Sequence, residues 1–209
     1  MSLPDPHPTA AERRQRVFEA MRVLMAEQGF RVSMEAVAQR AGCSKQTLYS
    51  QFGSKHALLQ DLMHEQLALT TARLGSFEAG VRAPLLAFAE EHLERMAAPD
   101  VLASCRLFSA ESPQFPDEAR GIWRDGGERL LQHLAQWLSQ AMQAGHLRHD
   151  DPHAAAELLL GMMLGLDFER LRFAVPQRRP DARRAWALRA VDAFLRAFAP
   201  DARAARCSH

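Results

Sequence analysis

The stretch AGCSKQTLYSQFGSK, residues 41–55, concentrates side chains that can form hydrogen bonds with anions or with the edges of nucleic-acid bases. Hydroxyl, amide and ammonium groups bond phosphate oxygens, a glutamine can bond adenine through two hydrogen bonds, and a lysine suits guanine O6 and N7. The chain has 26 Lys and Arg residues, and its two lysines, Lys45 and Lys55, both lie in this stretch. The residues that we predict to contact nucleic acid are Ser33, Ser44, Lys45, Gln46, Thr47, Tyr49, Ser50, Gln51 and Lys55.

Lys55 falls in the first turn of a predicted helix that follows the potential N-cap Ser54. A cation at a helix N-terminus opposes the helix dipole, at a cost of about 0.3–1 kcal/mol. A phosphate bound there would be held by both the free backbone amides and the ammonium group. We therefore predict that Lys55 contacts a backbone phosphate.

Two short predicted helices position these side chains. The pattern predicts a helix over 34–41 and a second helix over about 45–51, each preceded by a serine that can cap it. Leu48 and Phe52 are the apolar anchors of the second helix, so most of its surface stays free. Two helices joined by a tight glycine-containing turn are typical of a helix-turn-helix, which we place at about residues 33–52.

The remaining chain also favours helices, because Ala, Leu, Arg, Glu and Gln dominate it and apolar residues recur at three- and four-residue steps. We predict no strand and nine helices, over about residues 10–28, 34–41, 45–51, 55–77, 84–96, 99–112, 117–143, 154–173 and 182–198. The expected fold is all-α, with a helix-turn-helix domain at 10–65 and a second helical domain at 66–200.

The net charge of +1 says little by itself, but the charge is unevenly distributed. Residues 1–55 carry a net charge of +3, residues 56–171 carry −8 and residues 172–209 carry +6. A basic N-terminal part on an acidic body is the pattern expected of a chain that meets a polyanion with one end. The basic C-terminal part is a second candidate patch, although a solvated Arg-rich helix face explains it equally well.

Three cysteines at wide spacing, Cys43, Cys105 and Cys207, argue against a disulfide framework. No stretch reaches the ~18 unbroken apolar residues of a membrane helix, and the N-terminus lacks the apolar segment of a signal peptide. We therefore expect a cytoplasmic protein without contact to a membrane.

The run from Ala11 to Met63 resembles the DNA-binding domain of the TetR family of bacterial regulators. The resemblance rests on GF at 29–30, EAVAQRAGCSKQTLYSQF at 35–52 and SKHALL at 54–59. Three positions depart from the family pattern: Cys43 replaces a valine, Gln51 replaces a histidine and His56 replaces a glutamate. Because Gln51 can still bond a phosphate, these departures affect only the details of DNA contact.

The later part of the chain is similar, more weakly, to the AefR-like subgroup of TetR C-terminal domains. RLFSAESPQFPDEAR at 106–120 and AGHLRHDDPHAAAELLLGMMLG at 144–165 carry this similarity. The resemblance implies a homodimer that binds palindromic operator DNA and is released when a small molecule enters the C-terminal domain.

The last two predicted helices have apolar faces that are wide for packing within one chain. Glycines four residues apart would also let two backbones approach closely. We predict a dimer contact there, with ordinary core packing as the alternative; its residues are Leu158, Gly161, Met162, Gly165, Trp186, Val191, Phe194 and Phe198.

A small-molecule pocket needs apolar walls with a few polar groups. The candidates are Phe88, His92, Met96, Cys105, Phe108, Trp123, Trp137 and Met163, each of which could instead be a core residue. Methionines in such a lining would re-pack around several hydrophobic ligands.

We find no nucleophile elbow, phosphate loop, HExxH or dinucleotide turn, so an enzyme is not expected, nor a cofactor. His146, His149 and His153 are too loosely spaced to predict a metal site. The favoured interpretation is a repressor that a hydrophobic effector releases from DNA. The alternatives are a regulator that senses oxidation through Cys43 or Cys105, an activator, and a helical ligand carrier or enzyme.

Overall fold

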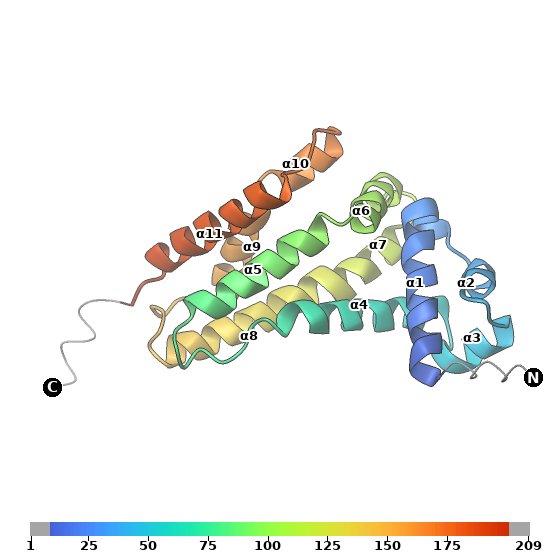
Figure 1. Ribbon diagram of the computed structural model, residues 1–209, viewed down its shortest axis with the longest axis horizontal. Coiled ribbons are helices and arrows are strands. Elements are labelled where there is room, and N and C mark those ends of the chain that lie inside the picture. The colour runs from blue at the N-terminus through green and yellow to red at the C-terminus, as the bar shows by residue number, and fades with distance from the viewer. Residues whose placement is uncertain (1–8, 201–209) are drawn as a thin grey trace, which may run out of the picture. The chain divides into compact units, whose positions relative to one another are not determined.

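The computed structural model describes residues 9–200, and in that range its regular secondary structure consists of helices, with no strand (Figure 1). It confirms the predicted all-α fold class. Cys207 and most of the proline-rich N-terminal segment lie outside the described residues. Between residues 9 and 200, no helix combines the length and the apolar character that crossing a membrane requires.

The chain folds into two compact units. Among the described residues, the first unit contains 9–63 and 99–120, whereas the second contains 64–98 and 121–200. The prediction had placed everything after residue 66 in one domain. The difference arises because α6 (Pro99–Glu111) packs against α1 (Ala10–Gln28) in the first unit.

The helices of the first unit enclose one apolar core. Phe18, Leu48, Leu58 and Leu62 are almost fully buried in it, and burying each such side chain stabilises the fold by about 1.5–3 kcal/mol. Besides α1 and α6, the elements are η1 (Gly29–Arg31), α2 (Met34–Ala41), α3 (Lys45–Phe52), the start of α4 (Lys55–Thr71) and most of α7 (Pro116–Ile122).

The second unit has its own core, which includes Leu85, Phe88, Leu138 and Leu159. Its elements are the end of α4, α5 (Arg82–Met96), the π-helical η2 (Trp123–Glu128), α8 (Arg129–Gln143), α9 (Pro152–Leu164), α10 (Asp167–Arg172) and α11 (Pro180–Ala197).

Helices α5 and α11 lie side by side and antiparallel (Figure 1). Arg82 binds both carboxylate oxygens of Asp192, at 2.8 and 3.2 Å, and Arg184 bonds Glu90 at 3.0 Å. Residue numbers fall along α11 as they rise along α5, which fixes the opposite direction of the two helices.

Two predicted helices are each divided, which makes eleven α-helices between residues 9 and 200 where nine were predicted. The predicted helix over 117–143 contains the π-helical turn η2, where the ring of Trp123 lies so close to Gly127 that a Cβ there would be 2.6 Å from it. The predicted helix over 154–173 ends and restarts at Gly165, which has φ of +52°. The helix predicted over 55–77 stops at Thr71.

Candidate nucleic-acid interface

The helix-turn-helix forms where its local signals place it. The hydroxyl of Ser33 accepts a hydrogen bond from the amide of Ala36 at 3.1 Å, and that of Ser44 accepts one from Thr47 at 3.0 Å. Each serine satisfies a free amide at a helix start. Gly42 ends α2 in the left-handed conformation, with φ of +68°, which a residue with a Cβ adopts only at a cost.

Two apolar side chains hold α3 against the first unit. Leu48 is fully buried, and the ring of Phe52 lies 5.9 Å from that of Phe18. All other α3 side chains are exposed: Lys45, Gln46, Thr47, Tyr49, Ser50 and Gln51. The helix therefore presents a polar surface of hydroxyl, amide and ammonium groups, as predicted.

Some of the predicted contact residues already have partners in the chain. Ser33 and Ser44 act as caps, and the hydroxyl of Thr47 lies 2.7 Å from that of Ser44. The Lys45 ammonium lies 3.6 Å from the Glu35 carboxylate, with both side chains more than half exposed. An exposed pair of this kind contributes about 0–1 kcal/mol and is easily exchanged for another partner.

Four α3 side chains have no partner of this kind. Within residues 9–200, the side chains of Gln46, Tyr49, Ser50 and Gln51 form no hydrogen bond with another residue, and Tyr49 is 44% exposed. Because they lose no internal bond on meeting a ligand, these side chains are the best suited of the set to read base edges or bind phosphates.

Lys55 is placed differently from the prediction. Its ammonium group donates to the backbone carbonyl of Phe30 at 3.0 Å, and the side chain is half-buried. The lysine thus supports the turn before α2. This internal bond is a structural reason for an ammonium group at this helix start, and the contact of Lys55 with a phosphate stays a prediction.

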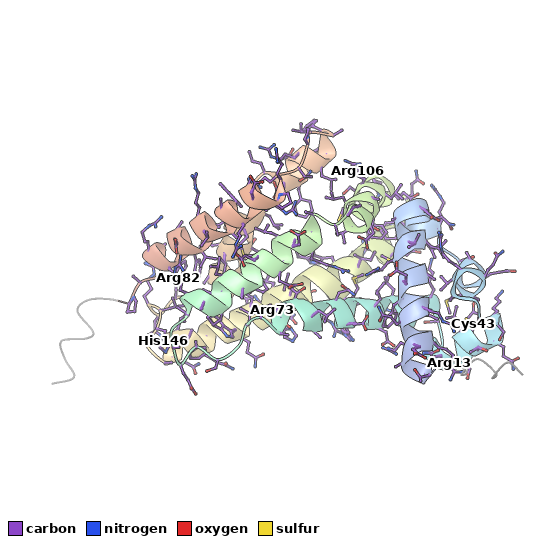
Figure 2. The ribbon with its side chains drawn as sticks, in the orientation of Figure 1. Arg13, Cys43, Arg73, Arg82, Arg106 and His146 are labelled. Atoms are coloured by element: carbon purple, nitrogen blue, oxygen red, sulfur yellow. The ribbon has the colours of Figure 1, made fainter. Side chains whose placement is uncertain are left out.

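Sequence reasoning missed Arg13, in the first turn of α1 (Figure 2). Arg13 is exposed and forms no ion pair within the described part of the chain. Its neighbour Arg14 instead bonds Asp61 at 3.0 Å and lies over the ring of Phe18 at 4.7 Å. The cluster RRQR at 13–16 was the signal in the sequence, but only the structure distinguishes Arg14, which is paired, from its neighbour Arg13.

Cys43 lies in the turn between α2 and α3 (Figure 2). It is a free thiol, half-buried against the apolar core of the first unit. This placement matches a small residue that fills the position of a valine. Cys105 is also free, and burial raises the pKa of its thiol, which favours the unreactive protonated form.

The residues predicted at a dimer contact divide into two groups. Leu158 is 52% exposed, and a Cβ on the exposed Gly161 would meet no other atom within 4 Å. By contrast, Val191, Phe194 and Phe198 are at most 3% exposed and pack in the core of their own unit. Their predicted role at a dimer contact is corrected, because buried side chains are not available to a second chain.

Gly165 and Trp186 also contact each other within one chain. The indole N–H of Trp186 donates to the carbonyl of Met163 at 2.8 Å, at the end of α9. A Cβ at Gly165 would lie 3.1 Å from the indole ring. The absence of a side chain at Gly165 therefore leaves space for the Trp186 ring. The prediction had instead explained this glycine by the close approach of a second backbone.

Further exposed apolar side chains follow Leu158 along the chain. We call Leu158, Leu166, Phe168, Phe173 and Val175 the 158–175 apolar set; their exposed fractions range from 43% to 68%. Large apolar side chains at this density in one segment are typical of a surface that contacts another protein. Their alternation with charged residues concealed them in the sequence.

The predicted pocket residues are divided between the two units. Phe108 belongs to the first unit, where its ring lies 4.6 Å from that of Phe30, and Cys105 is in the same unit. Trp123 is 61% exposed, while the indole N–H of Trp137 donates to the carbonyl of Gly75. Met96 and the buried Met163 belong to the second unit. A lining formed by these residues together stays a prediction.

Phe88 and His92 remain together in the second unit. Their rings stack at 5.8 Å with an interplanar angle of 10°, and both side chains are buried. Burial lowers the pKa of His92 to about 4, so the imidazole is neutral near pH 7. Within residues 9–200 this imidazole forms no hydrogen bond, so its two ring nitrogens can bond a ligand.

A hollow of about 400 Å³ lies elsewhere, between α5 and α11. Its charged walls include Arg73, Glu90, Glu91 and Arg184, and these charges pair with one another. Such a lining does not suit the hydrophobic effector that the sequence suggested.

A helix-turn-helix whose second helix is anchored by two apolar side chains and is polar elsewhere defines a DNA-binding protein. Comparison with known families supports this class. Residues 17–62 match the model described as "Bacterial regulatory proteins, tetR family", and residues 83–200 match "AefR-like transcriptional repressor, C-terminal domain". The chain belongs to the TetR family of transcriptional regulators.

Solved structures agree with this assignment. The chain is similar to the "Flavonoid-responsive Regulator FrrA", at 32% identity over 92% of this chain and 100% of that one, with a TM-score of 0.68. A TetR-family protein from Mesorhizobium loti MAFF303099 has 23% identity over 92% and 100% of the two chains and a TM-score of 0.73. Salmonella enterica GusR has 22% identity over 94% and 98%, with a TM-score of 0.62. The last two show the shared fold alone. No curated protein matches the sequence.

Proposed function

We propose that this regulator is a repressor that binds a palindromic operator as a homodimer and leaves it when an aromatic small molecule binds the second unit. The single observation that best supports operator binding is the polar, exposed surface of α3 in a chain of the TetR family. The match of residues 83–200 to a repressor C-terminal domain supports repression.

In the DNA complex, α3 lies in the major groove. Gln46 bonds an adenine edge, and Lys45 exchanges its exposed pairing with Glu35 for guanine or a phosphate. Tyr49 and Gln51 bond phosphates, while Arg13 adds a cation from α1. Lys55 acts indirectly by supporting the turn before α2.

The dimer contact uses Leu158, Gly161 and Met162 of α9 together with the rest of the 158–175 apolar set. Covering these side chains removes apolar surface from water, which stabilises association by about 25 cal/mol per Å². Dimer formation places two recognition helices at half-sites about 34 Å apart, one turn of DNA.

The effector is an uncharged aromatic compound with hydroxyl groups, of the flavonoid kind. FrrA, similar over its whole length, is described as flavonoid-responsive. The Phe88–His92 ring pair gives an apolar face beside a neutral imidazole that can donate to or accept from a phenol. The effector releases DNA because it binds more tightly to a conformation that does not fit the operator.

The test combines binding, release and turnover. An operator selected from random duplexes should be bound by the protein and released by naringenin, a flavonoid, but not by decanoic acid. His92→Leu should keep operator binding and lose the response to naringenin, whereas His149→Leu, at an exposed loop position, should retain both. Release by decanoic acid alone would contradict an aromatic effector. Chromatography should recover naringenin unchanged; its conversion would favour the enzyme alternative.

A further inference from the structure

The backbone of Phe30, in the turn between α1 and α2, is hydrogen-bonded at both its N–H and its carbonyl. The N–H donates to the Glu111 carboxylate at 3.0 Å, and the carbonyl accepts from the Lys55 ammonium at 3.0 Å. Glu111 ends α6 and Lys55 begins α4, so two helices distant in sequence hold the two peptide groups that flank the Phe30 Cα. We call this arrangement the Phe30 clamp.

Glu111 is buried, with a side chain only 8% exposed. A buried carboxylate is unfavourable unless it is paired and hydrogen-bonded. Here Arg31 neutralises it at 2.6 Å, and the Phe30 amide supplies the hydrogen bond. The carboxylate is therefore tied to two consecutive residues of the turn.

Apolar contacts reinforce the clamp. The Phe30 ring lies 4.6 Å from that of Phe108 and 5.8 Å from that of Phe115. Both partners come from residues 99–120, as does Glu111. The turn thus contacts residues 99–120 through the Phe30 amide, the Phe30 ring and the Arg31 guanidinium. A shift of residues 99–120 would disturb all three contacts.

Gly29 shows how closely side chains of α6 approach the turn. It has φ of +59°, and a Cβ there would lie 2.3 Å from a Glu111 carboxylate oxygen and 3.2 Å from Leu107 Cβ. Only glycine combines this backbone conformation with this space.

Chain connectivity gives the clamp its significance. Residues 97–98 alone separate α5 of the second unit from α6, and α7 continues through η2 into α8 without a loop. Residues 99–120 are therefore joined at both ends, by very short connections, to helices of the second unit. Meanwhile η1 leads directly into the helix-turn-helix.

We propose that Glu111 is a positioning residue for DNA binding: through the Phe30 clamp, residues 99–120 set the conformation of the Gly29–Arg31 turn and so the placement of α2 and α3. This inference rests on the proposed operator binding. It assigns the control of α3 to one carboxylate that contacts no DNA itself.

The direction of the change in operator affinity distinguishes a positioning role of Glu111 from a simple effect of its negative charge. Removing a carboxylate makes the protein more positive, which by itself strengthens binding to DNA. We expect the opposite for Glu111→Gln and Glu111→Ala: operator affinity falls, by about tenfold or more for alanine, because the Phe30 amide loses a charged partner. Glu118→Gln, at an exposed position of α7, is the control that reports the charge effect alone.

Two measurements on the full-length protein complete the test: the operator Kd, and hydrogen exchange at the Phe30 amide. Glu111→Ala should speed that exchange and weaken binding while the far-UV spectrum is unchanged. If Glu111→Ala fails to fold, Glu111→Gln, which keeps an acceptor but loses the charge, carries the same comparison.

The proposal would be overturned if the Glu111 variants bound the operator as tightly as Glu118→Gln does. This holds even if hydrogen exchange at the Phe30 amide were faster in the Glu111 variants. Wild-type protein that binds no duplex would instead refute operator binding itself. Gly29→Ala adds an independent readout: it should also weaken binding, and Glu111→Ala should partly suppress that loss because it removes the nearest clashing atoms.

Discussion

The exposed surfaces of helices α3 and α9 differ in polarity. In α3 the apolar side chains Leu48 and Phe52 are buried and the exposed ones are polar, whereas α9 exposes Leu158 and a bare Gly161. A polar exposed surface suits a hydrated, charged partner such as DNA, and an apolar one suits another protein surface. The contrast indicates which partner each unit meets.

The buried polar groups of the two units differ as well. Glu111 in the first unit is fully engaged, by the Phe30 amide and Arg31. His92 in the second unit is neutral and forms no hydrogen bond among residues 9–200. A satisfied buried group fixes a conformation, while an unsatisfied one leaves bonding capacity for a ligand.

The strongest test of the contrast exchanges leucine for alanine in both helices. Leu48→Ala should lower the free energy of unfolding by about 2–5 kcal/mol, because it opens a cavity in a closed core. Leu158→Ala should change protomer stability by no more than about 0.5 kcal/mol and weaken the dimer instead. Urea titration and sedimentation measure the two effects. Equal losses of stability would show that α9 is not a free surface.

The second test changes pH. The pKa of His92 falls from 6.5 in the unfolded chain to about 4 in the fold, so its stabilising contribution is complete above pH 6.5 and is lost as the pH drops toward 4. The loss should reach roughly 3 kcal/mol. His92→Leu should remove this part of the pH dependence, whereas His149→Leu should not. Identical curves for wild type and His92→Leu would argue against a buried neutral imidazole.

A smaller effect is expected from Gln46→Ala on α3. The variant should lose about 1–3 kcal/mol of discrimination at one base pair of the operator and keep its stability. Gln39→Ala, an exposed glutamine of α2, serves as the matched control. Competition binding with operators changed at single positions measures the loss; a uniform loss at all positions would mean that Gln46 only binds phosphate.

The smallest expected change concerns Lys45. If it contacts a phosphate, Lys45→Ala should reduce the slope of log affinity against log salt by about one. Its exposed pairing with Glu35 should matter little for stability. An unchanged slope together with lost preference for one guanine would assign Lys45 to base reading.

Local signals made the first unit predictable. The caps Ser33 and Ser44 and the turn at Gly42 act within a few residues, so their positions in sequence determined the helix-turn-helix. The role of Lys55 could not be predicted in this way, because its partner Phe30 lies 25 residues earlier. The same limit concealed Glu111, which is 81 residues from Phe30.

The second unit was predicted less well because its contacts depend on packing between distant helices. An apolar stripe on the last helix has the same sequence pattern whether it packs in the core of its own unit or against a second chain. Packing against α5 and α9 settles the matter for Val191 and Phe194. The division of the predicted pocket residues was equally hidden in the sequence, since the fold assigns Phe108 to one unit and Trp137 to the other.

Sequence-specific reading of DNA by α3 is tested most directly by selection from a random duplex pool. Full-length wild-type protein should enrich one palindromic word, and Gln46→Ala should relax its preference at one symmetric pair of positions. No enrichment, or the same enrichment with Gln46→Ala and Lys45→Ala as with wild type, would contradict the assignment of α3 as the recognition helix.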